Sequence, residues 1–295
     1  MYKIGFLGSD NSHVEKFCEI LNLSNHEKFW SNSGANVTGI WGEDSELTKK
    51  MASYGKIKNI ETSPESLVSN SDIVFVITRR PEKHLEYAKF AIDQKKPLFV
   101  EKPITQTINE AKTLINLVRK SNIIMTSFST LRFSSDTTNH IKQLNQIGNL
   151  TFANYLGPAS KYKSLLFYGI HIIELMLHIH GDEIESINAI EHPKNDVESN
   201  VQALCKFNDG SLVTLSFIGR GVYQFQMTGL SKNGVVNTQI NSDDFYEKGM
   251  KKLIPILTGK TKNPITFDQM LRSIQIAEAI ELSLETGTSI SPQDL

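Results

Sequence analysis

Residues 2–13, "YKIGFLGSDNSH", decide how the N-terminal part of the chain folds. A short apolar run ends at Gly8 and a helix-forming segment follows it. This is the order of strand, turn and helix that a dinucleotide-binding unit uses. A G-x-G-x-x-G turn would place further glycines where this chain has Asp10 and His13. The stretch therefore predicts a Rossmann-like turn that keeps its first glycine and departs from the pattern after it.

Short apolar runs alternate with helical segments up to about residue 125. The other expected strands of this part are residues 36–41, 72–78, 97–101 and 123–128. Segments 82–94 and 108–120 carry apolar residues at helical spacing, and Thr107 with Glu110 forms a capping-box pattern before the second. Strands that alternate with helices predict a doubly wound parallel sheet, which binds ligands beyond the carboxyl ends of its strands. We expect residues 1–124 to form a Rossmann-like dinucleotide-binding domain.

The pattern of the remaining chain is different, because strands there follow one another directly. The expected strands are residues 185–192, 200–219, 222–230 and 234–240, with a hairpin signal at 208–210. Two helices follow, the second over about 267–285. We expect residues 125–295 to form a substrate-binding α+β domain with a large, mostly antiparallel sheet. Because a broad sheet needs a cover on each face, we also expect a homodimer or homotetramer that assembles through this sheet.

Composition restricts the partners. The net charge is -1, from 31 basic and 32 acidic residues that are mixed along the chain, so no basic surface for nucleic acid or anionic lipid is expected. Cys18 and Cys205 give no disulfide framework or metal-ligand spacing. Neither a signal segment nor an apolar run long enough to span a membrane is evident. We expect a cytoplasmic protein that acts on a small molecule.

Three segments together resemble the Gfo/Idh/MocA family of NAD(P)-dependent oxidoreductases. They are "FVEKPIT" at 99–105, "SDIVFVITRRPEKHLEYAKFAI" at 71–92 and "MLRSIQIAEAIELSLETGTSISP" at 270–292. The resemblance covers essentially the whole chain, and it implies NAD or NADP as the cofactor. In that family the lysine of the E-K-P motif lies where nicotinamide and substrate meet, which implies that Lys102 is the catalytic acid/base. A lysine whose pKa is lowered by burial can accept the proton of a substrate hydroxyl, although a lysine after a strand is often only a surface residue.

The family's D-x-G-x-H motif is kept only in part. This chain has Phe167, Gly169 and His171 at its three fixed positions. The resemblance implies that His171 assists proton transfer or orients the substrate hydroxyl, without an aspartate to share the proton. The adjacent Tyr168 carries a phenol, but neighbouring helix positions face different directions, so it is no simple substitute. It is counted among the substrate-binding candidates.

His171, Glu174 and His178 share one face of the same expected helix. Metal ligands on a helix have such spacing, but the segment is otherwise Ile, Leu and Met and its two outer histidines are two turns apart. We therefore expect no metal, and either a buried polar face or a substrate-facing His171 supported by Glu174. Ser129 and Arg132 follow the strand at 123–128, where a hydroxyl and a guanidinium suit a polyhydroxylated or carboxylated substrate. A solvated arginine and an ordinary loop serine are the alternative.

The expected cofactor site gathers residues at the strand ends. They are Gly8, Ser9, Asp10, Asn11, Ser12, His13, Glu43, Thr78, Arg79, Arg80, Glu101 and Lys102. A carboxylate about 5 Å from a phosphate charge would cost roughly 3 kcal/mol at an effective dielectric near 20. Asp10 must therefore cap its own helix, pair with Arg79 or Arg80, or occupy the phosphate's place. Gly42 stands where a ribose-binding aspartate is usual, with Glu43 next, so the choice between NAD and NADP is open.

These observations favour an oxidoreductase that transfers hydride to or from a sugar, polyol or related hydroxy compound. Lys102 would be its acid/base and His171 its assistant. Two alternatives stay open. One is a non-catalytic ligand-binding or regulatory protein on the same fold, because fold alone does not fix function. The other is an enzyme that uses a bound dinucleotide for elimination without net redox change.

Overall fold

The computed structural model describes residues 1–159, 165–194, 198–221 and 223–295, and these fall into two compact units. The first unit comprises Met1–Phe128 and Tyr246–Phe267, and the second comprises Ser129–Phe245 and Asp268–Leu295. The first unit thus includes a segment from the C-terminal part, which the sequence pattern assigned to the other domain. Val222, the first residue of the expected strand at 222–230, lies outside the described residues.

The first unit contains a six-stranded sheet in the order β3-β2-β1-β4-β5-β6. Its strands are β1 (Tyr2–Leu7), β2 (Ala35–Trp41), β3 (Asn59–Ile60), β4 (Ile73–Val76), β5 (Leu98–Val100) and β6 (Met125–Thr126). All neighbouring strands pair in parallel. The strand order reverses beside β1, and this confirms the predicted doubly wound sheet with ligand-binding positions beyond the strand ends.

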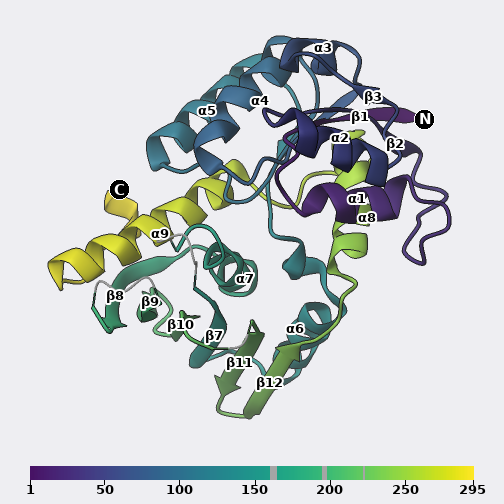
Figure 1. Cartoon of the computed structure of the whole chain (residues 1–295). Helices are drawn as coiled ribbons and strands as arrows, with labels where there is room; N and C mark the ends of the chain where they lie inside the picture. The colour runs from purple at the N-terminus through teal and green to yellow at the C-terminus, as the bar shows by residue number, and fades with distance from the viewer. Residues whose placement is uncertain (160–164, 195–197, 222) are drawn as a thin grey trace. The chain divides into compact units, whose positions relative to one another are not determined.

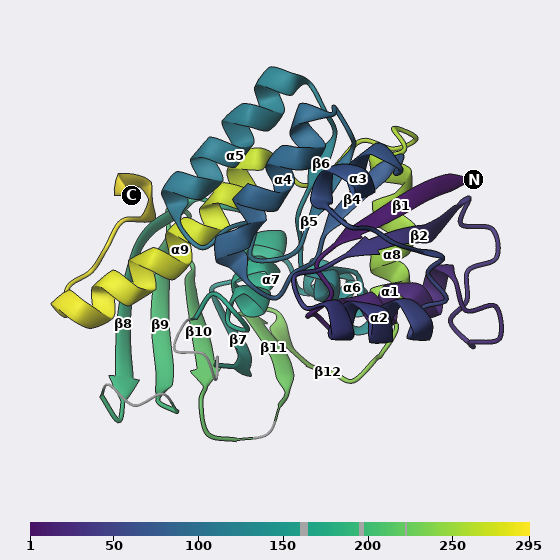
Figure 2. The ribbon, with the colours of Figure 1, turned by 45° about the horizontal axis from the view of Figure 1, so that its top comes forward.

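Helices cover both faces of this sheet. They are α1 (His13–Leu21), α2 (Ser45–Tyr54), α3 (Pro64–Ser69), α4 (His84–Asp93), α5 (Ile108–Ser121) and α8 (Phe245–Leu257). Figure 2 shows α3, α4 and α5 on one face and α1 and α2 on the other. The predicted capping box is confirmed, since Thr107 and Glu110 bond each other's backbone at the start of α5. An aromatic core forms inside the unit, where Phe75 stacks on Phe6 and makes edge-on or tilted contacts with Phe17 and Phe99.

The second unit is built on a six-stranded sheet in the order β12-β11-β7-β10-β9-β8. Its strands are β7 (Phe152–Pro158), β8 (Ile184–His192), β9 (Asn200–Phe207), β10 (Leu212–Ile218), β11 (Phe225–Ser231) and β12 (Gly234–Ile240). Within the described part of this second sheet, only β7 and β10 pair in parallel, and the other neighbours are antiparallel. The predicted mostly antiparallel sheet is therefore confirmed, and so is the hairpin at 208–210, which joins β9 to β10.

Helices α6 (Ser135–Ile147), α7 (Ile170–His180) and α9 (Phe267–Thr286) belong to the second unit and cover one face of its sheet (Figure 1). Alternate strand residues such as Tyr155 and Leu215 point to this face and are fully buried. The residues between them point to the other face, which no described helix covers. That face exposes large apolar side chains: Phe152, Ile190, Leu212, Leu230 and Val235. No helix of the described ranges is both long and apolar enough to cross a membrane.

His140 makes the second unit sensitive to acid. It lies on α6, is fully buried, and its Nδ1 is 2.9 Å from the Thr238 hydroxyl of β12. Burial lowers its pKa to about 4. Between about pH 6.5 and that value the unfolded chain binds a proton that the folded chain refuses, so stability falls as pH falls. We expect the free energy of unfolding, measured in urea, to fall less over this interval in His140→Asn, which cannot titrate. Equal falls in both proteins would contradict this role.

Candidate functional site

Gly8 ends β1 with a turn that crosses close to β4. Its φ is +114°, and a Cβ atom there would lie 2.4 Å from the Thr78 backbone nitrogen. Its own amide donates to the Trp41 carbonyl at the end of β2. Only glycine permits both this backbone conformation and this close approach. The first requirement of a dinucleotide turn is thus met in the structure.

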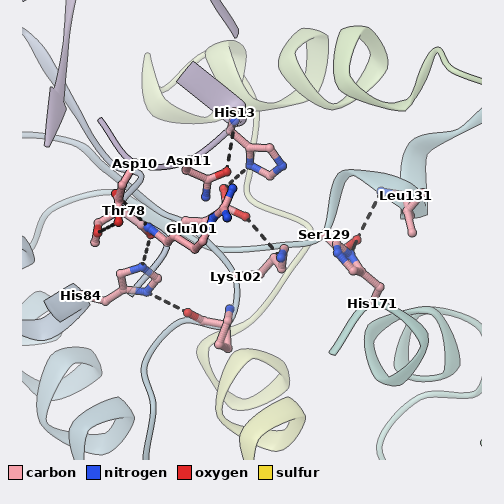
Figure 3. A network of polar contacts seen from close by, with 12 residues as sticks. Asp10, Asn11, His13, Thr78, His84, Glu101, Lys102, Ser129, Leu131 and His171 are labelled. Carbon is pink, nitrogen blue, oxygen red and sulfur yellow. Dashed lines mark hydrogen bonds and ion pairs between the residues drawn. The ribbon is translucent and has the colours of Figure 1, made fainter. Parts of the chain in front are cut away.

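Asp10 turns its carboxylate away from helix α1. Its two oxygens accept the Thr78 hydroxyl at 3.2 Å and the Arg79 backbone amide at 3.1 Å, as Figure 3 shows for Thr78. The side chain that accepts the first helical amide is instead Asn11, which bonds the His13 amide. Asp10 therefore neither caps its helix nor pairs with a guanidinium. It ties the turn after β1 to the end of β4.

The turn still presents donors to an anion. Among the described residues, the backbone amides of Asn11 and Ser12 have no hydrogen-bond acceptor, and they lie directly before α1. Unpaired amides at a helix N-terminus attract phosphate. At the neighbouring strand end the Ser9 hydroxyl packs against Gly42, since a Cβ there would lie 2.2 Å from it. The unpaired amides therefore suit the pyrophosphate of a dinucleotide, whereas a side chain at position 42 would require Ser9 to shift.

Glu43 is held by its own neighbours. Its carboxylate pairs with the Arg80 guanidinium and accepts the Tyr87 hydroxyl at 2.6 Å, and the Lys83 amine lies 3.8 Å away. The Tyr87 hydrogen bond is the main cause of a lowered Glu43 pKa, with Arg80 and Lys83 adding to it. Asp44 caps α2 by accepting two backbone amides. Both acids after β2 are thus engaged, while the Arg79 side chain next to this group is exposed.

Glu101 and Lys102 follow β5 and are both buried (Figure 3). One Glu101 oxygen is 2.6 Å from Nδ1 of His13, and the other is 3.9 Å from Nζ of Lys102. Burial alone would raise the pKa of Glu101, but His13 and Lys102 hold it below its ordinary value. The structure therefore brings His13, from the turn after β1, to Glu101 and Lys102 at the end of β5.

His84 holds the far side of the same loop. Its Nδ1 is 2.8 Å from the Pro103 carbonyl oxygen and its Nε2 is 3.0 Å from the Thr78 carbonyl oxygen. Burial lowers its pKa, and the nearby carbonyl oxygens and Glu101 oppose that effect. Sequence reasoning missed this histidine. The spacing of the sequence could have identified it. His84 lies four residues before Ala88 and seven before Ala91, and this spacing places all three on the buried face of α4.

His171 lies in the first turn of α7 in the second unit. Its Nδ1 is 2.7 Å from the Ser129 hydroxyl, and the Ser129 amide donates to the Glu174 carboxylate at 2.6 Å. A Cβ at Gly169 would meet the Leu165 carbonyl oxygen at 2.4 Å, so the start of the helix packs tightly. The structure thus brings together three of the predicted substrate residues. Phe167, which replaces the aspartate, packs its ring against Tyr168.

The other two candidates of this unit lie apart from that bond. Arg132 is buried, and Nη2 lies 3.5 Å from the Glu174 carbonyl oxygen. Burial lowers its pKa and Glu174 opposes this. Tyr168 contacts Tyr223 as well as Phe167. Within the described ranges, no three His, Cys, Asp or Glu side chains are grouped so that they could hold a metal ion.

Tyr246 is the second residue that the sequence did not indicate. Its ring contacts those of His13 and Phe17, with centroids 5.0 and 6.3 Å away. It comes from α8, more than a hundred positions after the rest of the first unit, and no local pattern marks it. Its contact with His13 places α8 against α1 beside the turn.

Residues 3–128 match a family model described as an oxidoreductase family with an NAD-binding Rossmann fold. Oxidoreductase P35 of Formosa agariphila is 26% identical over 193 residues, which are 57% of this chain and 60% of that protein. An oxidoreductase of Schizosaccharomyces pombe is 32% identical over 93 residues, or 31% of this chain and 25% of that protein. The chain thus matches less than two thirds of the length of these relatives.

The whole chain also has the fold of a solved dehydrogenase. The scyllo-inositol dehydrogenase of Lactobacillus casei, crystallised with NAD(H) and scyllo-inositol, superposes with a TM-score of 0.84. The alignment covers 99% of each chain at 15% identity. This likeness shows the fold of both units.

Gly8→Ala tests the close crossing at the turn. We expect a loss of about 3 kcal/mol in the free energy of unfolding, because an alanine adds both an unfavourable φ and a clash with Thr78. Gly34→Ala is the matched control, since Gly34 also has a positive φ but nothing lies within 4 Å of its Cβ position. That control should lose about 1 kcal/mol. Equal losses in urea unfolding would show that the crossing at Gly8 is not tight.

Proposed function

We propose, on the premise that residues 3–128 belong to the Gfo/Idh/MocA oxidoreductases with an NAD-binding Rossmann fold, that this protein is a nicotinamide-dependent oxidoreductase. Its substrate is a sugar, polyol or related hydroxy compound. The observation that carries the proposal is the direct bond between His13, which opens the helix after the cofactor turn, and Glu101 of the E-K-P loop. One sheet edge therefore holds both an anion-binding turn and a buried lysine.

The dinucleotide would be held by the residues at the ends of β1, β2 and β4. The amides of Asn11 and Ser12 suit its pyrophosphate, as does the glycine turn before them. Bound nicotinamide supplies the acceptor or donor of hydride. Because Asp10 is fixed by Thr78 and Arg79, its charge faces the β4 end and is partly satisfied by hydrogen bonds. This arrangement supports a working cofactor turn in spite of the missing glycines.

Lys102 is proposed as the acid/base. Oxidation of a hydroxyl requires removal of its proton, and an amine in a buried position can take it. Glu101 lies 3.9 Å from the Lys102 amine and stabilises its charged form once the proton has been received. In the reverse reaction the same ammonium returns the proton to the carbonyl oxygen. The chain's own contribution at this point is thus to hold and move one proton at Nζ.

His171 is proposed to orient the substrate hydroxyl from the second unit. Its Nδ1 lies 2.7 Å from the Ser129 hydroxyl, and this contact fixes the orientation of the ring. Glu174 fixes the Ser129 backbone and keeps that hydroxyl in place. The proposed substrate class is supported by the Lactobacillus casei enzyme of the same fold, which was crystallised with the cyclic polyol scyllo-inositol. We place the activity in the cytoplasm, which agrees with two free, buried cysteines.

The residues after β2 favour no single dinucleotide. Glu43 is the proposed ribose contact, yet its carboxylate is engaged by Arg80 and Tyr87. If Glu43 keeps that place, the Arg80 guanidinium lies beside the ribose and can balance a 2′-phosphate. Both NAD(H) and NADP(H) therefore belong in the test.

Lys102→Ala separates binding from turnover. We expect the purified protein to bind NAD(H) or NADP(H) with micromolar affinity by fluorescence titration, and the variant to bind within about threefold of wild type. Turnover of cyclic and acyclic polyols should fall by at least about a hundredfold, the range of a lost general base. Lys89→Ala, at an exposed lysine of α4, is the control and should keep full turnover.

Two outcomes would overturn this function. Binding of a sugar-like ligand in a thermal-shift screen, with no binding of any of the four dinucleotides, would identify a ligand-binding protein instead. Dinucleotide that co-purifies and is never consumed during product formation would identify a reaction without net redox change.

We also propose a homodimer or homotetramer through the uncovered face of the second sheet. Leu212 lies there on the central strand β10, and an aspartate at this place in an interface would be buried without a partner. We expect Leu212→Asp to reduce the mass measured by light scattering to that of one chain. Ile60→Asp changes an exposed apolar residue of the first unit and should leave the mass unchanged. A wild-type protein of one chain would refute this assembly.

A further inference from the structure

His13 occupies the position of the third glycine in the cofactor turn, and its side chain has a specific partner. The imidazole is buried and its Nδ1 lies 2.6 Å from Oε2 of Glu101. A glycine at this position would leave helix α1 free to pack close to the strands. Here the ring itself fills the space between α1, the loop after β5 and Tyr246 of α8. The substitution thus adds a bond between two strand ends that are not neighbours in the sheet.

The two oxygens of the Glu101 carboxylate face two different basic side chains, His13 and Lys102. Oε2 bonds His13, while Oε1 has no hydrogen-bond donor and faces the Lys102 amine at 3.9 Å. The carboxylate is 2% exposed, so water cannot screen its charge. One buried negative charge therefore serves as the counter-ion of two groups that can each carry a positive charge.

The tautomer of His13 follows from this geometry. A carboxylate is an acceptor only, so Nδ1 must carry a proton whether the ring is neutral or charged. A second proton can enter only at Nε2, which bonds no described residue. When it enters, the imidazolium neutralises Glu101, and the Lys102 ammonium loses part of its counter-charge. Protonation of either base therefore disfavours protonation of the other.

We propose that His13 is a positioning residue: it holds the Glu101 carboxylate against Lys102 and, through that shared carboxylate, ties the protonation of Lys102 to its own. The functional meaning of this coupling rests on the proposed role of Lys102 as acid/base. The coupling itself concerns only residues of the first unit.

Other titratable groups face this cluster and must be accounted for. His84 from α4 acts on Glu101 through its charge, and Tyr246 from α8 contacts the His13 ring. Each ring nitrogen of His84 lies within 3.0 Å of a backbone carbonyl oxygen, and a neutral ring can donate to only one of the two. Tyr246 contacts the His13 ring edge-on. At the Glu101 oxygens themselves, Nδ1 of His13 lies 2.6 Å from Oε2 and the Lys102 amine lies 3.9 Å from Oε1.

Nuclear magnetic resonance of the ring nitrogens tests the coupling without any catalysis. In ¹⁵N-labelled wild-type protein, the neutral His13 ring is expected to show its proton on Nδ1 at every pH. In Lys102→Met, which removes the competing charge and keeps the length of the side chain, the titration midpoint of His13 should rise by about one pH unit. Lys89→Met removes an exposed charge of α4 and should not move it. An unchanged midpoint in Lys102→Met, or a proton on Nε2 alone, would overturn the proposal.

Two substitutions at His13 test the positioning. His13→Asn places an amide donor where Nδ1 was, whereas His13→Phe keeps a ring against Phe17 and Tyr246 and has no donor. We expect turnover to fall at least tenfold further in the Phe variant than in the Asn variant, with dinucleotide affinity similar in both. Equal turnover in the two folded variants would exclude a role for the bond.

Failure of the proposed function and failure of the coupling between His13 and Lys102 give different results. If the protein binds no dinucleotide and the His13 midpoint still shifts, the function is wrong and the coupling stands. If it binds and turns over but the midpoint does not shift, Lys102 acts without His13. Should either His13 variant fail to fold, the Lys102→Met titration decides alone, because it leaves His13 and Glu101 intact.

Discussion

A carboxylate buried at the end of β5 is the constraint on which the first unit depends. Glu101 cannot stay charged in the interior without partners, because removing a lone carboxylate from water is very costly. The partner with the short hydrogen bond is His13, which is the first residue of α1. Since β4 lies between β1 and β5 in the sheet, the bond spans a whole strand. It therefore fixes the turn after β1 relative to the lysine loop.

The second departure from the glycine pattern works in the same way over a shorter distance. Asp10 bonds Thr78 and Arg79 at the end of β4, the immediate neighbour of β1. His84 then lies between the Thr78 and Pro103 carbonyl oxygens, 3.0 and 2.8 Å from its ring nitrogens, and continues the connection to the loop after β5. Side chains thus replace, by specific bonds, the close backbone packing that further glycines would have allowed. The amides of the turn are left for a ligand because the side chains take other donors.

The sequence predicted the elements well and their side-chain partners poorly. Alternating runs gave the strand ends, and parallel strands bring those ends to one edge, so most candidate residues of the first unit were identifiable. Periodicity does not tell which donors a carboxylate will choose, and Asp10 and Glu43 each had several within reach. The sequence pattern placed the segment Tyr246–Phe267 in the second domain, because it carries an ordinary helical pattern and its contacts are with residues far away in the sequence.

In the second unit, a hydroxyl lies beside the His171 ring. Phe167 takes the place of an aspartate and packs against Tyr168, and the Ser129 hydroxyl lies 2.7 Å from Nδ1 of His171. A hydroxyl orients an imidazole but stabilises its charged form far less than a carboxylate does. This contact therefore supports the proposed orienting role of His171. Lys102, by contrast, has a buried carboxylate beside it, and that carboxylate is shared with a second base. The gain of His13 in the first unit thus ties the carboxylate beside Lys102, the proposed acid/base, to the turn after β1.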